Sequence, residues 1–219
     1  KDGVGYSKVD EKVNSVCPYC GVGCLLTYNV KDNKILYTDG RDGPANLSRL
    51  CVKGRYGFDY INNDGRLTKP LIRKKGVSKD IDVSKFDFNN ISDIFEETTW
   101  ENALALACDG FNNIKSKLGP NALAGFGCAK GSNEEAYLFQ KLIRTGFNTN
   151  NVDHCTRLCH ASSVVALLEM IGSGAVSNQV ADVTEAEVIV IIGSNPTVNH
   201  PVAATFMKNA AKEGKTLIC

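Results

Sequence analysis

The stretch Cys17-Pro-Tyr-Cys-Gly-Val-Gly-Cys24 places three thiols within eight residues, and a fourth thiol, Cys51, follows after twenty-six intervening residues. Thiols separated by two or three residues can converge on one metal centre from a single loop, and a distant fourth can close the site. Such sets of thiolates hold either a structural zinc ion or an iron–sulfur cluster. Cys51 lacks the second CxxC pair that is usual in a zinc ribbon. The spacing therefore favours a [4Fe–4S] cluster and leaves zinc as the alternative.

The residues around these thiols predict a small Cys-rich domain over residues 13–66, with a short β-sheet. The polar, Gly-containing residues 1–12 are expected to form a linker that arrives from an upstream region. Lys53 lies two residues beyond Cys51. Most lysines are solvated surface residues, and the position beside a metal ligand adds contact with a second redox partner as an interpretation for this one.

Hydrophobic periodicity and turn residues predict strands and helices along the rest of the chain. We expect strands at 25–30, 34–38, 122–126, 188–192 and from 216, and helices at 51–61, 98–118, 133–145, 156–170 and 202–212. The run at 188–192 is continuously apolar, as in strands that are buried in a parallel sheet. The alternation from residue 98 onward therefore predicts an α/β fold, with the start of a doubly wound domain over residues 67–219.

Three further expectations concern a helix start, a connecting segment and the end of the chain. Thr98 and Glu101 have the spacing of a capping box at the start of a helix. Residues 64–95 are charged and weakly periodic, which predicts an extended connector over the surface. The last expected strand reaches the final residue, so we expect an incomplete domain and hence a fragment of a longer protein.

The composition argues against a nucleic-acid-binding protein and against a membrane-spanning one. Lys and Arg number 25 against 24 Asp and Glu, so the net charge of +1 predicts no nucleic-acid partner. The longest apolar run, Ala103 to Cys108, is far shorter than the roughly 18 residues that span a bilayer, which predicts no membrane segment. The nine cysteines are an odd number and unevenly spread, which fits metal ligands in a reducing compartment better than a disulfide framework.

A second group of thiols lies in His154-Cys-Thr-Arg-Leu-Cys-His160. Cys155 and Cys159 are four residues apart, so they share one face if this segment is helical. A zinc site is one interpretation, although neighbouring side chains on a helix cannot all converge on one ion. A thiol nucleophile with a histidine base is a second interpretation.

The chain resembles a known family at three motifs. Val16 to Cys24, Arg41-Asp-Gly-Pro-Ala-Asn46 and Leu50-Cys-Val-Lys-Gly-Arg-Tyr-Gly57 are similar to the N-terminal cluster domain of the molybdopterin oxidoreductase superfamily. The resemblance runs from about Val13 to the end. It implies a cofactor in which molybdenum or tungsten is carried by two molybdopterin guanine dinucleotides. It also implies one [4Fe–4S] cluster with four ligands, Cys17, Cys20, Cys24 and Cys51. Lys53 would conduct electrons between this cluster and a pterin.

The pair Cys159-His160 resembles formate dehydrogenases in particular, where a selenocysteine or cysteine followed by histidine ligates the metal. Related nitrate reductases carry methionine at the position of His160. The resemblance implies that Cys159 is a metal ligand, that His160 handles a proton, and that formate is oxidised to carbon dioxide. We expect His154 to be structural and Cys155 to lie in buried packing. The alternatives are a nitrate reductase-like enzyme and a metal-free relative such as the large iron–sulfur subunit of NADH dehydrogenases.

The loop after the strand at 188–192 lies where α/β sheets bind ligands. The family places part of a guanine dinucleotide there, which implies contacts from Gly193, Ser194, Asn195 and His200. Lys130 and Asn133 follow the expected strand at 122–126 and are further candidates. No proper GxGxxG motif follows a strand, so a nicotinamide site on this chain is not supported.

Three short motifs resemble the cytoplasmic, NAD-coupled branch of formate dehydrogenases: Asp42 to Asn46, Ala129 to Asn133 and Gly174 to Val176. That branch implies a cytoplasmic location and electron-accepting iron–sulfur and flavin subunits that reduce NAD. A substrate-clamping arginine of the family is expected beyond residue 219. The chain alone is therefore expected to be inactive.

Overall fold

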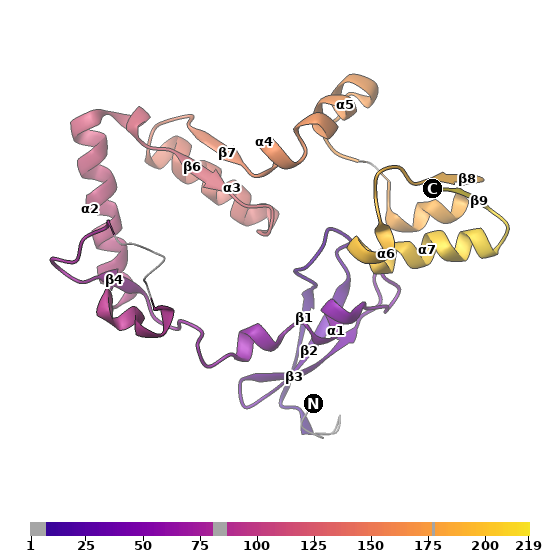
Figure 1. Ribbon diagram of the computed structural model, residues 1–219, viewed down its shortest axis with the longest axis horizontal. Coiled ribbons are helices and arrows are strands. Elements are labelled where there is room, and N and C mark those ends of the chain that lie inside the picture. Colours follow the sequence, from indigo (N-terminus) through magenta and orange to yellow (C-terminus); the bar gives the residue numbers. More distant parts are fainter. Residues whose placement is uncertain (1–7, 81–86, 177) are drawn as a thin grey trace. The chain divides into compact units, whose positions relative to one another are not determined.

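The computed structural model describes residues 8–80, 87–176 and 178–219 (Figure 1). Its contacts define two compact units, one formed by the chain up to Arg66 together with Ser163–Cys219, the other by Leu67–Ser162. Each unit is described by itself below. The sequence assigned residues 67–219 to one domain, and those boundaries stay a prediction.

The first unit begins with a three-stranded antiparallel sheet in the order β1-β2-β3, made of β1 (Glu11–Val16), β2 (Leu25–Lys31) and β3 (Lys34–Gly40). The expected hairpin is confirmed, and Asp32 and Asn33 turn it with φ of 49° and 58°. Strand β1 was not expected. It includes Glu11 and Lys12, so the linker prediction is wrong there, and residues 1–7 lie outside the described residues. All but one of its side chains are exposed, so it left no alternating apolar signal.

The helix expected at 51–61 is two short pieces. Helix α1 spans Val52–Tyr56 and a 3₁₀ helix spans Asp59–Asn62. The backbone leaves the α conformation at Gly57, whose N–H donates to the carbonyl of Lys53 at 2.7 Å. The short helix therefore ends directly after the segment that carries Cys51 and Lys53.

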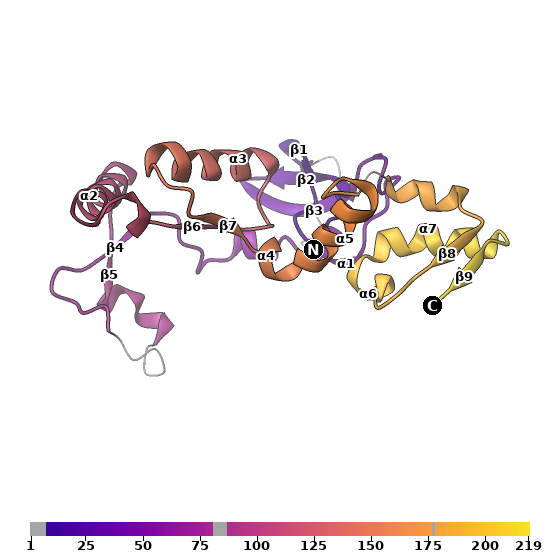
Figure 2. The same cartoon turned by 90° about the horizontal axis from the view of Figure 1, so that it is seen from above.

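The later part of this unit is a strand–helix–strand arrangement. Strand β8 (Val188–Val190) pairs in parallel with β9 (Thr216–Ile218), and helices α6 (Pro196–Asn199) and α7 (Pro201–Lys212) lie between them in sequence. Figure 2 shows α7 beside the two strands. A 3₁₀ helix at Val180–Glu185 precedes them. Only Ile189 of β8 is buried in this chain, so the fully buried strand that the apolar run predicted is not formed.

The core of the first unit joins residues far apart in sequence. Val22 and Cys24 from the Cys-rich loop pack with Val202, Ala203 and Phe206 from α7. All five are at most 9% exposed. The thiol loop is therefore built into the same core as the helix that follows β8.

The second unit contains two further pairs of strands. β4 (Leu71–Arg73) and β5 (Phe95–Glu97) pair antiparallel, and β6 (Gly125–Gly127) and β7 (Val152–His154) pair in parallel. A 3₁₀ helix spans Phe88–Asp93. The prediction of an extended connector over 64–95 is therefore wrong in part, and its residues 81–86 lie outside the described ranges. Strands of three residues are too short to show a period of two.

The helices of the second unit lie close to their expected positions. They are α2 (Trp100–Leu118), a 3₁₀ helix (Pro120–Ala122), α3 (Asn133–Lys141) with a π-helical turn (Leu142–Gly146), and α4 (Thr156–Cys159), while α5 (Ala161–Ile171) crosses into the first unit. The cap of α2 is Thr99, whose hydroxyl accepts from the N–H of Asn102 at 3.3 Å, so the expected Thr98 cap is wrong by one residue.

The α/β class is confirmed, with a small antiparallel sheet first and parallel strand pairs after it. In the described residues the parallel strands form two separate pairs. None of the helices there is both long enough and apolar enough to cross a bilayer.

Candidate metal centre and thiol–imidazole segment

Residues 17–24 connect β1 to β2, because Val16 at the end of one strand pairs with Leu25 at the start of the other. The N–H of Cys17 donates to the carbonyl of Cys24 at 2.9 Å and closes the loop. Gly23 adopts a φ of 70°, a left-handed conformation that glycine accepts without steric cost. Three thiols are therefore presented by one loop that its own hydrogen bonds define.

The fourth thiol belongs to the residue that precedes α1. The carbonyl of Cys51 accepts from the N–H of Arg55 at 3.0 Å. The hydroxyl of Tyr19 donates to the carbonyl of Gly57, which ties the thiol loop to the end of the same helix. A Cβ atom at Gly57 would lie only 2.5 Å from that hydroxyl oxygen, so this contact requires glycine.

A buried asparagine holds the two thiol-bearing segments together. Asn46 is 0% exposed. Its Oδ1 accepts from the N–H of Leu25 at 3.1 Å, and its Nδ2 lies within 3.1 Å of the carbonyl oxygens of Leu25, Arg41 and Arg49. One side-chain amide therefore joins the strand that leaves Cys24 to the loop that leads into α1. The motif Arg41 to Asn46 was used for the family resemblance, but the sequence did not reveal this structural role of Asn46.

The structure brings the four cysteines together in one pocket. Burial and the neighbouring thiols of Cys17, Cys20 and Cys51 raise the pKa of Cys24 to about 11. The pocket is also lined by Tyr19, Leu50, Lys53, Gly54, Asn199, Pro201 and Val202. Lys53, the expected electron-conducting residue, thus lies beside the thiols.

The donor set fits an iron–sulfur cluster. The raised pKa of Cys24 disfavours its thiolate, and bonding to cationic iron would supply the charge that stabilises that thiolate. A zinc site needs all its sulfurs about 2.3 Å from one point, whereas a four-iron cube binds each sulfur at a separate iron.

A second cavity of the first unit, of about 530 Å³, follows β8. Ser194 and His200 line it, together with Gly21 and Val22 of the thiol loop. Gly193, with a φ of 62°, and Asn195 belong to the same loop but do not line this cavity. Two of the four expected dinucleotide contacts are thus brought together.

The second unit has a cavity of about 700 Å³ at the carboxyl ends of β6 and β7. Lys130 lines it, whereas Asn133, the first residue of α3, does not. Cys128, Glu135, Asp153 and His154 also line it and were not among the expected contacts. Cys128 directly follows β6, and Asp153 and His154 are the last residues of β7, so recognition of β7 as a strand could have found them. Glu135 lies in α3.

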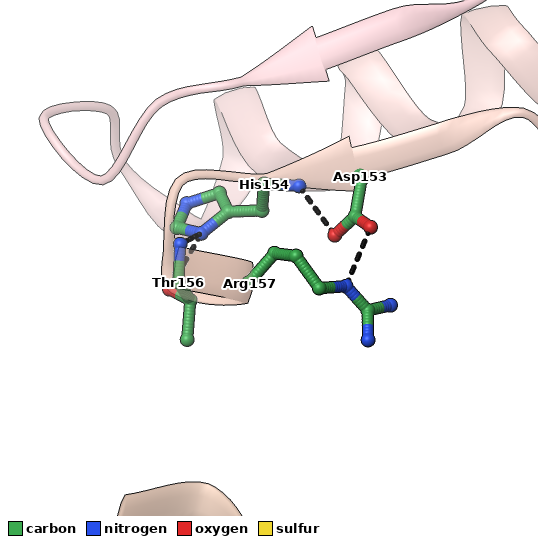
Figure 3. A network of polar contacts seen from close by, with 4 residues as sticks. All are labelled: Asp153, His154, Thr156 and Arg157. Atoms are coloured by element: carbon green, nitrogen blue, oxygen red, sulfur yellow. Dashed lines mark hydrogen bonds and ion pairs between the residues drawn. The ribbon is translucent and has the colours of Figure 1, made fainter. Parts of the chain in front are cut away.

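A polar network orders the segment between β7 and α4 (Figure 3). Asp153 accepts from Arg157 Nε at 2.7 Å and from the N–H of His154 at 2.8 Å, and the hydrogen bonds from these groups lower the pKa of this carboxyl. Nδ1 of His154 accepts from the N–H of Thr156 at 3.1 Å and lies 2.6 Å from its hydroxyl. These bonds fix the backbone where the one-turn helix α4 begins.

Cys159 and His160 lie at the other end of α4. His160 leaves the helix with φ −125° and ψ 13°, while its N–H still donates to the carbonyl of Thr156. At this end of the helix, Cys159 Sγ lies 4.0 Å from His160 Nε2. Both side chains are exposed. Cys155 is exposed too, so the expectation that it lies in buried packing is wrong.

Comparisons with known proteins agree with this architecture. The model of the molybdopterin oxidoreductase Fe4S4 domain matches residues 10–63, and that of the molybdopterin oxidoreductase family matches residues 66–219. The chain therefore belongs to the molybdopterin oxidoreductase family.

Among relatives, proteins of Staphylococcus aureus strains RF122 and MSSA476, each carrying the name "Putative formate dehydrogenase", are 41% identical to this chain over 203 residues. The match covers 92% of this chain and 19% of each relative. The chain thus spans about a fifth of their length. The solved structure of acetylene hydratase from Pelobacter acetylenicus has the same fold, with a TM-score of 0.66 at 16% identity, over 94% of this chain and 26% of that one.

Proposed function

We propose that this chain is part of the catalytic subunit of a formate dehydrogenase. The reaction is the conversion of formate to carbon dioxide, a proton and two electrons. The observation that carries the proposal is the thiol of Cys159 placed 4.0 Å from the imidazole of His160 at the end of α4. The 41% identity to relatives that bear a formate dehydrogenase name supports the same substrate.

Two cofactors are proposed. Cys17, Cys20, Cys24 and Cys51 hold a [4Fe–4S] cluster, and Cys159 ligates molybdenum or tungsten that is carried by two molybdopterin guanine dinucleotides. When bound, the metal centre would supply an acceptor for two electrons, and the soft thiolate of Cys159 suits such a metal. Gly193, Ser194, Asn195 and His200 are proposed contacts of a dinucleotide, and Lys130 and Asn133 are further candidates.

His160 is proposed to hold the proton that formate releases. Its Nε2 lies 4.0 Å from the sulfur that would bind the metal, so it would be near a substrate held at that metal. An imidazole that is exposed to solvent can pass a proton on to water.

Lys53 is proposed to assist electron transfer at the cluster. Its side chain lines the pocket of the four thiols. An ammonium group there stabilises the negative charge that accompanies an added electron. The electrons would then pass to iron–sulfur and flavin subunits that reduce NAD. The resemblance to the cytoplasmic, NAD-coupled branch of formate dehydrogenases leads us to propose a cytoplasmic enzyme.

The test compares two cysteines in the intact enzyme that contains this chain. Cys159→Ser replaces the thiolate with a hydroxyl, a poor ligand for this metal, so formate oxidation should nearly vanish. Cys155→Ser, four residues earlier and also exposed, is the matched control and should retain activity. Loss of activity in the control alone would show that the wrong cysteine is assigned. An enzyme that reduces nitrate but does not oxidise formate would overturn the substrate.

A further inference from the structure

One wall of the thiol pocket comes from a part of the chain far in sequence from the four cysteines. Asn199, Pro201 and Val202 line the pocket from the junction of α6 and α7. The match to the Fe4S4 domain ends at residue 63, so this wall comes from the region that matches the molybdopterin oxidoreductase family.

Val202 is the buried core side chain of that wall. It is 4% exposed and packs in one core with Val22 and Cys24. Phe206, also 4% exposed, lies four residues further along α7 and hence on the same face of the helix. These two side chains anchor α7 against the thiol loop.

Arg49 ties the same helix to the approach to Cys51. Its guanidinium donates to the hydroxyl of Thr205 at 3.3 Å. The guanidinium carbon lies 5.0 Å from the centre of the Phe206 ring, within the range of a cation–π contact. Because Arg49 is two residues before Cys51, α7 is fastened to both thiol-bearing segments.

We propose that Val202 is an apolar seal that keeps water away from the cluster, and that Arg49 and Phe206 are positioning residues that hold it there. The reduction potential of an iron–sulfur cluster depends on its exposure to solvent and on hydrogen bonds to its sulfurs. The apolar shell around a metal site controls how solvent reaches it. Opening the seal should therefore raise the potential and speed the loss of the cluster in air. This inference rests on the proposed cluster.

The test uses the 219-residue chain with its cluster assembled anaerobically. Val202→Thr keeps the shape of the side chain and adds a hydroxyl. Val198→Thr, in α6 at 64% exposure and outside the pocket lining, is the matched control. Iron content, the midpoint potential from an EPR-monitored redox titration and the rate of bleaching in air are measured for each.

Val202→Thr should keep its iron, shift the midpoint potential to a more positive value and bleach several-fold faster, while Val198→Thr matches the wild type. Arg49→Gln, a substitution on the surface, should shift both quantities in the same direction by less, and it tests the seal even if Val202→Thr misfolds. If the iron-loaded variants show an unchanged midpoint potential and an unchanged bleaching rate, the proposed seal is wrong while the proposed cluster stands. A wild-type chain that takes up no iron would overturn the proposed cluster, and the seal with it.

Discussion

The thiol pocket of the first unit and the thiol–imidazole segment of the second differ in how much protein surrounds them. Cys24 is 6% exposed and packs in a core that includes α7. Cys159 and His160 are exposed on a single helical turn, and Leu158 beside them is 93% exposed. The backbone of the second site is fixed at the start of α4, by the network around Asp153 and His154, rather than at the reactive pair itself.

The two proposed tasks place different demands on these sites. A cluster that only transfers electrons is best kept dry and rigid, because solvent changes its potential. A thiol and an imidazole that act on a small substrate must stay accessible to it. Substitutions should therefore affect cofactor retention in the first site and turnover in the second.

The largest effect is expected from Cys24→Ser. Loss of one of four thiolates should reduce the iron of the anaerobically reconstituted chain from about four atoms to near zero, with loss of the broad visible absorption. Cys108→Ser, at an exposed position of α2, is the control and should load normally. Stoichiometric zinc without iron in the wild type would contradict the cluster assignment.

His160→Gln should lower turnover and leave the cofactors bound, which is the reverse of the loss of cofactor expected for Cys24→Ser. The variant should keep its metal and its iron, while formate oxidation by the intact enzyme falls by ~10²–10⁴-fold, the range for a positioned acid–base group. Leu158→Ala, at an exposed position two residues earlier, is the control. Wild-type turnover in His160→Gln would remove the reason for preferring formate over nitrate chemistry.

Asn46→Ala tests whether the first site depends on its buried framework. The substitution leaves the N–H and carbonyl groups of the thiol-bearing segments without their partner, so the free energy of unfolding should fall by about 2–4 kcal/mol. Asn14→Ala removes an exposed bond to Thr27 on the same sheet and should change it by less than about 0.5 kcal/mol. Urea unfolding measures both, and equal effects would show that Asn46 is not a special support.

The smallest effect is expected from Lys53→Ala. Iron content should not change, because Lys53 is not a ligand, while electron transfer to the acceptor slows about tenfold, the equivalent of ~1.4 kcal/mol. Lys34→Ala removes an exposed charge of the same sign from the start of β3 and serves as the control. Stopped-flow reduction of the acceptor measures both, and an unchanged rate for Lys53→Ala would make Lys53 a surface residue.

Features that depend on neighbours in sequence were predictable. The hairpin of β2 and β3 has apolar runs on both sides of a turn, and α7 has an apolar helical period. Features without a local pattern were missed, namely the exposed edge strand β1 and the three-residue strands β4, β5 and β7. The Thr98 cap failed because Thr98 and Thr99 are chemically alike and only the backbone conformation selects one of them.

The sequence by itself determined the chemistry: four cysteines at cluster spacing, a cysteine followed by histidine, and a lysine beside the fourth thiol. Covalent order alone establishes these facts. Only the structure showed that α7 forms a wall of the thiol pocket, that Asn46 joins the two thiol-bearing segments, and that Cys159 Sγ lies 4.0 Å from His160 Nε2. Such contacts join residues far apart in the chain or depend on backbone conformation, and neither leaves a local pattern of residues.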